Sequence, residues 1–172
     1  MKSVINVGLI GAGRIGQVHA ETLAYSVPGA RLAGIADLNA AVVEETARRL
    51  GASRWTTDPL ELINDPNIQA VAIASPNDTH ADLIIAAASA GKAIFCEKPI
   101  DQDLAKTEQA LSAVVTAGAF AAWLPEALRC RPPTYPARSP GGEAWALDLC
   151  AFAYTRPRTT SLHQLGFRRR HI

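Results

Sequence analysis

The sequence predicts an α/β protein built on a doubly wound parallel sheet. Between residues 4 and 118, short apolar runs rich in β-branched residues alternate with segments of helical periodicity. A glycine-rich turn joins the first apolar run to the first helical segment. Strands that alternate with helices form parallel pairs with right-handed crossovers, and such sheets bind ligands beyond the carboxyl ends of their strands.

The elements follow one another in a regular order. The expected strands span residues 4–10, 31–37, 53–56, 68–75 and 93–98, and the expected helices span residues 14–26, 39–51, 59–65, 78–91 and 103–118. Asn39 is placed to cap the second helix and Gly51 to end it, while Asp101 or Asp103 caps the last helix.

The last expected helix has the pattern of an amphipathic helix, because Leu104, Leu111 and Val115 share one apolar face. Beyond it the composition changes. Residues 1–118 hold nine Lys and Arg against thirteen Asp and Glu, whereas residues 119–172 hold eight against three, with no lysine and six of the eleven prolines.

This change divides the chain into a domain at residues 1–118 and an irregular tail at residues 119–172. Residues 119–124 are a candidate sixth strand, and the rest of the tail has no hydrophobic period. We expect the tail to be poorly ordered or loosely packed.

Properties of the whole chain exclude several classes of function. A net charge of +1 gives no electrostatic basis for a nucleic-acid or membrane partner, and the basic end FRRRHI is short and lacks interleaved aromatic residues. The longest uncharged run, residues 110–125, is too short to span a bilayer, and the N-terminus shows no signal peptide. Three widely spaced cysteines form no disulfide framework or metal motif, so we expect no metal and a reducing cytoplasm.

The glycine-rich turn has the pattern Gly11-x-Gly13-x-x-Gly16 between a strand and a helix. The first glycine permits the tight turn, the second lets the backbone approach a pyrophosphate, and the third lets the helix pack closely. The helix N-terminus attracts phosphate, and Arg14 and Ile15 belong to the same expected contact surface. The alternative is a tight turn that binds no cofactor, but strand, turn and helix together favour a dinucleotide.

Asp37 ends the second expected strand, 21 residues beyond Gly16. An acid at this place accepts hydrogen bonds from the ribose hydroxyls of the adenosine and repels the 2′-phosphate of NADP. Arg14 opposes this preference, because a guanidinium in the loop pairs well with that phosphate. We therefore expect NAD, with NADP as the alternative.

Three segments, GLIGAGRIGQVHAETLA, ASPNDTHADLI and AGKAIFCEKPIDQDLA, resemble the family named for glucose–fructose oxidoreductase and inositol dehydrogenase, the Gfo/Idh/MocA family. Within it, the likeness is strongest to myo-inositol 2-dehydrogenases and covers the N-terminal, NAD-binding Rossmann domain. The resemblance implies a cytoplasmic dehydrogenase that moves hydride from a secondary alcohol of a polyol or sugar to NAD. It also implies a homo-oligomer, whose interface this chain lacks.

The resemblance implies roles for individual residues. The loop of Ser75, Pro76 and Asn77 would line the cofactor site, with His80 opening the next helix near the same crevice. Glu97 would lie near the nicotinamide ribose. Lys98, followed by a cis peptide to Pro99, would bind the substrate hydroxyl and help its proton leave.

The chemistry of Lys98 also follows from its place in the sequence. An ammonium at the carboxyl end of a central strand points into the ligand crevice, where it stabilises a developing alkoxide. The alternatives are less specific: a lysine or a histidine such as His80 is by default a solvated surface group. His19 is read as helix surface or packing, and Cys96 as a buried small hydrophobe.

The second domain of the family has no counterpart here. Gly141 and Gly142 are not followed by the D-x-x-x-H of the family's substrate domain. One hypothesis is a frameshift near codon 118 that replaced this domain with an unrelated tail. The alternative to a dehydrogenase is therefore a non-catalytic dinucleotide-binding module or an inactive fragment.

Overall fold

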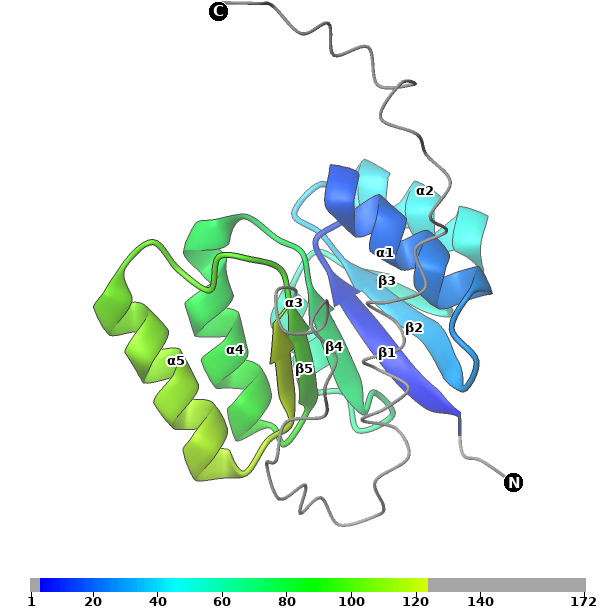
Figure 1. The fold of residues 1–172 in the computed structure, drawn as a ribbon. Helices are drawn as coiled ribbons and strands as arrows, with labels where there is room; N and C mark the ends of the chain where they lie inside the picture. Colours follow the sequence, from blue (N-terminus) through cyan, green and yellow to red (C-terminus); the bar gives the residue numbers. More distant parts are fainter. Residues whose placement is uncertain (1–3, 124–172) are drawn as a thin grey trace, which may run out of the picture.

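The computed structural model of the chain describes residues 4–123 of the 172 (Figure 1). Six strands form one parallel sheet in the order β3-β2-β1-β4-β5-β6. They are β1 (Ile5–Ile10), β2 (Ala30–Ala36), β3 (Arg54–Thr56), β4 (Ala70–Ile73), β5 (Ala93–Cys96) and β6 (Ala121–Trp123). This order confirms the doubly wound fold, because the chain runs outward from β1 first in one direction and then in the other.

Helices cover both faces of the sheet. They are α1 (Arg14–Tyr25), α2 (Ala40–Leu50), α3 (Pro59–Ile63), α4 (His80–Ser89) and α5 (Leu104–Ala117), with a 3₁₀ turn, η1 (Asn77–Thr79), before α4. Figure 1 shows α1 and α2 on one face and α4 and α5 on the other. Each expected helix and strand exists, with ends that differ from expectation by only a few residues.

Two apolar cores follow from this layering. In β1, Val7 and Leu9 pack toward α1 and α2, whereas Ile10 belongs to the core under α3, α4 and α5. Successive strand residues point to opposite faces, and both faces of this sheet are covered. Each fully buried aliphatic side chain contributes about 1.5–3 kcal/mol to folding. Because β1 has such side chains in both cores, it stabilises the packing of helices on both faces of the sheet.

The helix caps form as the sequence predicts. Asn39 accepts a hydrogen bond from the amide of Val42, Gly51 ends α2 in the left-handed conformation, and Asp103 caps α5. Side-chain oxygens at the N-cap satisfy amides that the helix leaves unpaired.

The apolar face expected for α5 does not reach the core of the described residues. Leu104 and Val115 are 71% and 74% exposed, and α5 instead buries Ala110 and Val114. The periodicity predicted the helix correctly. Because α5 packs closely against α4, the small side chain of Ala110 lies in the contact between the two helices.

The sheet extends beyond Gly118. Residues 121–123 pair with β5, with Ala121 opposite Ile94, which confirms the candidate sixth strand and covers the edge of β5. The sheet therefore continues past the boundary expected at residue 118. The expectations for the remaining tail, residues 124–172, lie outside the described residues. Within residues 4–123, no helix combines the length and apolar character needed to cross a membrane.

Candidate functional site

The residues expected to bind a cofactor gather at the carboxyl ends of β1, β2, β4 and β5. Strand β1 lies at the centre of the sheet, with β2 on one side and β4 on the other. The strand order reverses between β1 and β4, and open α/β sheets bind ligands beyond the carboxyl ends of their strands at such a point. The glycine turn lies there, between β1 and α1.

The three glycines of the turn differ in what surrounds them. A Cβ on Gly11, whose φ is +98°, would lie 2.6 Å from the backbone of Ala74 and Ser75, and one on Gly16 would overlap the carbonyl of Gly11. A Cβ on Gly13 would meet nothing within 4 Å among residues 4–123. The fold itself thus explains Gly11 and Gly16, whereas the space at Gly13 is open for a ligand to approach the backbone.

Helix α1 begins at this open position. Gly13 is its N-cap, and no side chain caps the first turn. The first amides of the helix, at Arg14, Ile15 and Gly16, have no partner within the helix. Together with the helix dipole, they suit a phosphate group.

Asp37 fixes the glycine turn to the end of β2. Its carboxylate accepts hydrogen bonds from the amide of Ala12 at 2.6 Å and from that of Asn39 at 2.9 Å. Arg14 is exposed, and its guanidinium makes no ion pair with the other described residues. The described contacts of the Asp37 carboxylate are thus with backbone amides. Its role toward a ribose, and with it the preference for NAD over NADP, stays a prediction.

The loop after β4 is held by its own hydroxyls. Ser75 and Thr79 share a hydrogen bond of 2.7 Å between their side-chain oxygens, and the Thr79 hydroxyl and amide both donate to the carbonyl of Pro76. Pro76 and Asn77 are exposed on the carboxyl rim of the sheet. The role of Ser75, Pro76 and Asn77 in lining a cofactor site stays a prediction from the family resemblance.

His80 is placed differently from either expectation. Its side chain is completely buried, so it is not a solvated surface group and it does not line the crevice. One ring nitrogen lies 2.8 Å from the carbonyl oxygen of Ser75 and the other 2.8 Å from that of Pro99. His80 therefore contacts the backbone of two loops, the one after β4 and the one after β5, from the buried side.

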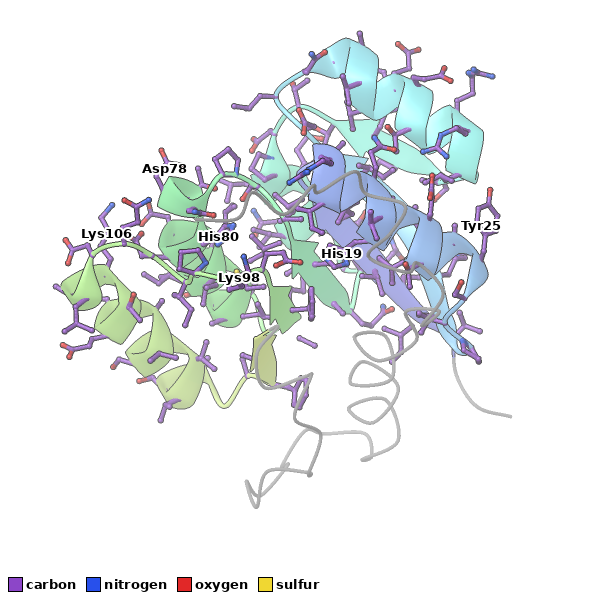
Figure 2. The ribbon with its side chains drawn as sticks, turned by 45° about the horizontal axis from the view of Figure 1, so that its top comes forward. His19, Tyr25, Asp78, His80, Lys98 and Lys106 are labelled. Carbon is purple, nitrogen blue, oxygen red and sulfur yellow. The ribbon has the colours of Figure 1, made fainter. Side chains whose placement is uncertain are left out.

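Lys98 follows the end of β5 on the same rim as the glycine turn (Figure 2). Its side chain is exposed and makes no hydrogen bond or ion pair with the other described residues. The peptide bond to Pro99 is cis, as the family resemblance implies. The ammonium thus lies exposed on the carboxyl rim, where its charge helps to lower the pKa of Glu97.

Glu97 points inward instead. It is 7% exposed and its carboxylate lies 2.7 Å from the ring nitrogen Nε2 of His19, which is 8% exposed. Burial raises the pKa of Glu97, but the hydrogen bond and charge of His19, with the amide and charge of Lys98, outweigh it and hold the pKa below its usual range. Its place near a ribose stays a prediction; its described contacts are with His19 and Lys98.

His19 is the site residue that sequence reasoning missed. It lies on the buried face of α1 with Gly16, Ala20 and Leu23, and its ring meets the edge of Phe95 at 5.3 Å between centroids. The expectation of packing was right and that of helix surface was wrong. The signal was its spacing of three residues from Gly16, which puts both on the face toward the sheet.

Cys96 is fully buried, as predicted. Burial, with a further contribution from the charge of Glu97, raises the pKa of its thiol to about 12. A thiol in this state is not a nucleophile at neutral pH. Among residues 4–123, no group of histidine, cysteine and acidic side chains is arranged to hold a metal ion.

Comparison with known proteins agrees with this geometry. A family model described as "Oxidoreductase family, NAD-binding Rossmann fold" matches residues 5–122. The chain is 42% identical over 118 residues to a scyllo-inositol 2-dehydrogenase (NAD(+)) of Bacillus subtilis, covering 69% of this chain and 34% of that protein. It is 47% identical over 110 residues to an inositol 2-dehydrogenase of Rhizobium meliloti, covering 64% of this chain and 32% of that one.

A solved structure of an inositol dehydrogenase has the same fold over the matched residues. The scyllo-inositol dehydrogenase of Lactobacillus casei, crystallised with NAD(H) and scyllo-inositol, superimposes with a TM-score of 0.68 at 28% identity, over 70% of this chain and 36% of that one. The chain spans about a third of the length of the curated relatives it matches. The family model matches most of the chain, and the sheet has the doubly wound order with the glycine turn after its central strand β1. The chain therefore belongs to the Gfo/Idh/MocA oxidoreductase family.

Proposed function

We propose that this chain binds NAD across the carboxyl ends of β1, β2, β4 and β5 and contributes the NAD-binding half of a polyol dehydrogenase. The observation that carries the proposal is the open space at Gly13, because no contact within the described residues requires a glycine there. Backbone amides at the start of α1 would hold the diphosphate, and Asp37 would accept a hydrogen bond from the adenosine ribose.

The role proposed for Lys98 follows from its exposed ammonium, which has no hydrogen bond or ion pair within residues 4–123. Bound NAD supplies the hydride acceptor. Oxidation of a secondary alcohol also requires loss of the hydroxyl proton, and an ammonium beside the oxygen stabilises the alkoxide that develops. The names of the relatives, scyllo-inositol 2-dehydrogenase and inositol 2-dehydrogenase, favour a cyclic polyol as substrate.

A second candidate function is cofactor binding without turnover. The observation that favours it is coverage: the match to the relatives spans about a third of their length. Under this alternative the described residues bind NAD, and Lys98 has no substrate beside it.

Binding is tested by titrating the full chain with NADH and following nicotinamide fluorescence. Gly13→Ala should weaken binding at least about tenfold because the added methyl occupies the approach to the backbone, while the thermal unfolding midpoint stays unchanged. The matched variant Gly16→Ala should lose stability as well, because its Cβ meets the Gly11 carbonyl. Equal affinity in the wild-type protein and Gly13→Ala would reject the proposed site.

Turnover separates the two candidate functions. NADH absorbance is followed after NAD is mixed with myo-inositol or scyllo-inositol and the full chain. Turnover that disappears in Lys98→Met, with NADH affinity retained, supports the dehydrogenase. Binding without any turnover supports the second candidate.

A further inference from the structure

We propose that His80 is a positioning residue that works as an imidazolium cation, holding two loops of the cofactor site together through both of its ring N–H groups. His80 opens α4 and is completely buried. Its Nε2 lies 2.8 Å from the carbonyl oxygen of Ser75, and its Nδ1 lies 2.8 Å from that of Pro99.

The number of donors decides the protonation state. Both partners are backbone carbonyl oxygens, which accept hydrogen bonds and cannot donate them. A neutral imidazole carries one N–H and one lone pair, so it satisfies one carbonyl and turns its lone pair toward the other. Only the imidazolium donates to both carbonyls at these distances.

The two carbonyls belong to the loops that carry the proposed nicotinamide side of the site. Ser75 lies two residues after β4 and precedes the exposed Pro76 and Asn77, and Pro99 directly follows Lys98. Figure 2 shows His80 and Lys98 on the same side of the sheet. The ring of His80 connects the two loops through the carbonyls of Ser75 and Pro99, and so holds the backbone next to Asn77 relative to the backbone next to Lys98.

The described contacts of the His80 ring are the two carbonyls, and the charged side chains nearby in the fold are of both signs. The elements that pack against α4 are α3, η1, β4, β5 and α5. The charged side chains on these elements, on α4 and on the loop after β5 are Glu61, Asp78, Asp82, Glu97, Asp101, Asp103 and Glu108, with Lys98 and Lys106, and Lys92 directly precedes β5. One carboxylate oxygen of Asp101, two residues after Pro99, is buried without a hydrogen-bond partner in the described residues.

The dipole of α4 opposes a positive charge at the helix N-terminus. Complete burial opposes it as well, because a buried charge loses its hydration. The stabilisation of the imidazolium must therefore come from the hydrogen bonds to the two carbonyls. The consequence is that loss of one proton from the imidazolium removes the hydrogen bond to one of the two loops. The effect of this release on the cofactor rests on the proposed function; the protonation state itself does not.

The protonation state is measured directly in the wild-type protein. Long-range ¹H–¹⁵N correlation spectra distinguish an imidazolium from either neutral tautomer, and the signals of His80 are identified by their absence in His80→Gln. The expected result at about pH 6, within the titration range of histidine, is two protonated ring nitrogens in the folded protein. A single neutral tautomer at that pH would overturn the proposal.

The positioning role is measured by NADH affinity between about pH 6 and pH 8. Wild-type affinity should fall about fivefold over this range, the effect of losing one hydrogen bond. His80→Gln, which offers a donor to one loop only, should bind weakly with a flat profile. His80→Phe, which keeps the ring volume and has no donor, should bind at least as weakly.

Controls keep the two proposals separable. The double variant His163→Gln/His171→Gln, which removes the two histidines outside the described residues, should keep the wild-type profile. If His80→Gln retains the wild-type pH dependence, the positioning role is rejected. If the wild-type protein binds no NADH at any pH, the proposed function fails, and the spectra still decide the protonation state of His80.

Discussion

Strand β5 carries a lysine near each end, and the two lysines have opposite environments. Lys92, before the strand, is 8% exposed, and its ammonium donates to the carbonyls of Asp65 and Ile68 at 2.7 Å each. Burial lowers its pKa, and the charge of Asp65 opposes that effect. Lys98, after the strand, is exposed, and its ammonium makes no hydrogen bond with the other described residues.

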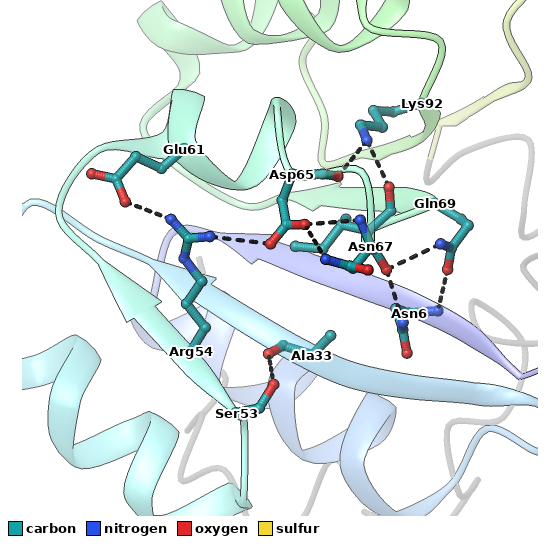
Figure 3. A network of polar contacts seen from close by, with 10 residues as sticks. Asn6, Ala33, Ser53, Arg54, Glu61, Asp65, Asn67, Gln69 and Lys92 are labelled. Atoms are coloured by element: carbon teal, nitrogen blue, oxygen red, sulfur yellow. Dashed lines mark hydrogen bonds and ion pairs between the residues drawn. The ribbon is translucent and has the colours of Figure 1, made fainter.

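The same difference distinguishes the two rims of the sheet. On the amino rim, polar groups satisfy one another (Figure 3): Arg54 contacts Glu61 and Asp65, and Asn67 connects Asp65 to Gln69 through hydrogen bonds. On the carboxyl rim, a Cβ on Gly13 would contact none of the described residues, and the Lys98 side chain is exposed. Polar groups that the fold does not use are those available to a ligand, which is why we place function on the carboxyl rim.

The largest expected effect comes from exchanging the two lysines for methionine one at a time. Lys92→Met should lower the free energy of unfolding by about 2–4 kcal/mol, because two carbonyls lose their donor in a buried site. Lys98→Met should change it by less than about 0.5 kcal/mol, as surface substitutions do. Urea denaturation at neutral pH measures both.

This pair of variants is its own control, since the same substitution is made on the same strand. Equal stability losses would contradict the division between a structural and a functional rim. The division between a structural and a functional rim is supported further if Lys98→Met, but not Lys92→Met, changes NADH affinity or NAD-dependent turnover.

The next effect concerns Glu97, the buried group of the carboxyl rim. Its pKa is lowered in the folded protein, so the carboxylate contributes stability above about pH 4.5 that is lost as the pH falls through the lowered pKa. Glu97→Gln should therefore cost about 1–3 kcal/mol at pH 6, and the gap to the wild-type protein should close in acid.

Thermal unfolding of both proteins between about pH 3 and pH 6 tests this dependence. Glu45→Gln is a suitable control, because Glu45 pairs with Arg48 on the exposed surface of α2. A gap between wild type and Glu97→Gln that stays constant with pH would show that Glu97 is not held ionised by His19 and Lys98.

The smallest effect is expected for the exposed ion pairs of the amino rim. Arg54 is 42% exposed and bonds to Glu61 at 2.7 Å and to Asp65 at 3.1 Å. Arg54→Ala should cost no more than about 1 kcal/mol, since solvent screens exposed pairs, and added salt should reduce the difference. A loss as large as that of Lys92→Met would show that the network in Figure 3 acts as one unit.

Much of the fold was readable from local pattern. The alternation of strands and helices and the caps at Asn39 and Asp103 each depend on neighbours within a few residues. The predictions failed where distant segments decide. The face of α5 was misplaced because the contact with α4 selects Ala110 over Leu111 and Val115.

The sequence by itself determined the element order, the glycine turn, Asp37 at the end of β2 and Lys98 after β5, because residue type and spacing fix these locally. Only the tertiary structure decided that His19 contacts Glu97 and that His80 lies between two carbonyls. It also decided that the Lys92 side chain is buried whereas that of Lys98 is exposed. The physical reason is that burial and hydrogen-bond partners are set by segments far apart in the chain, and parallel pairing brings those segments to one rim or the other.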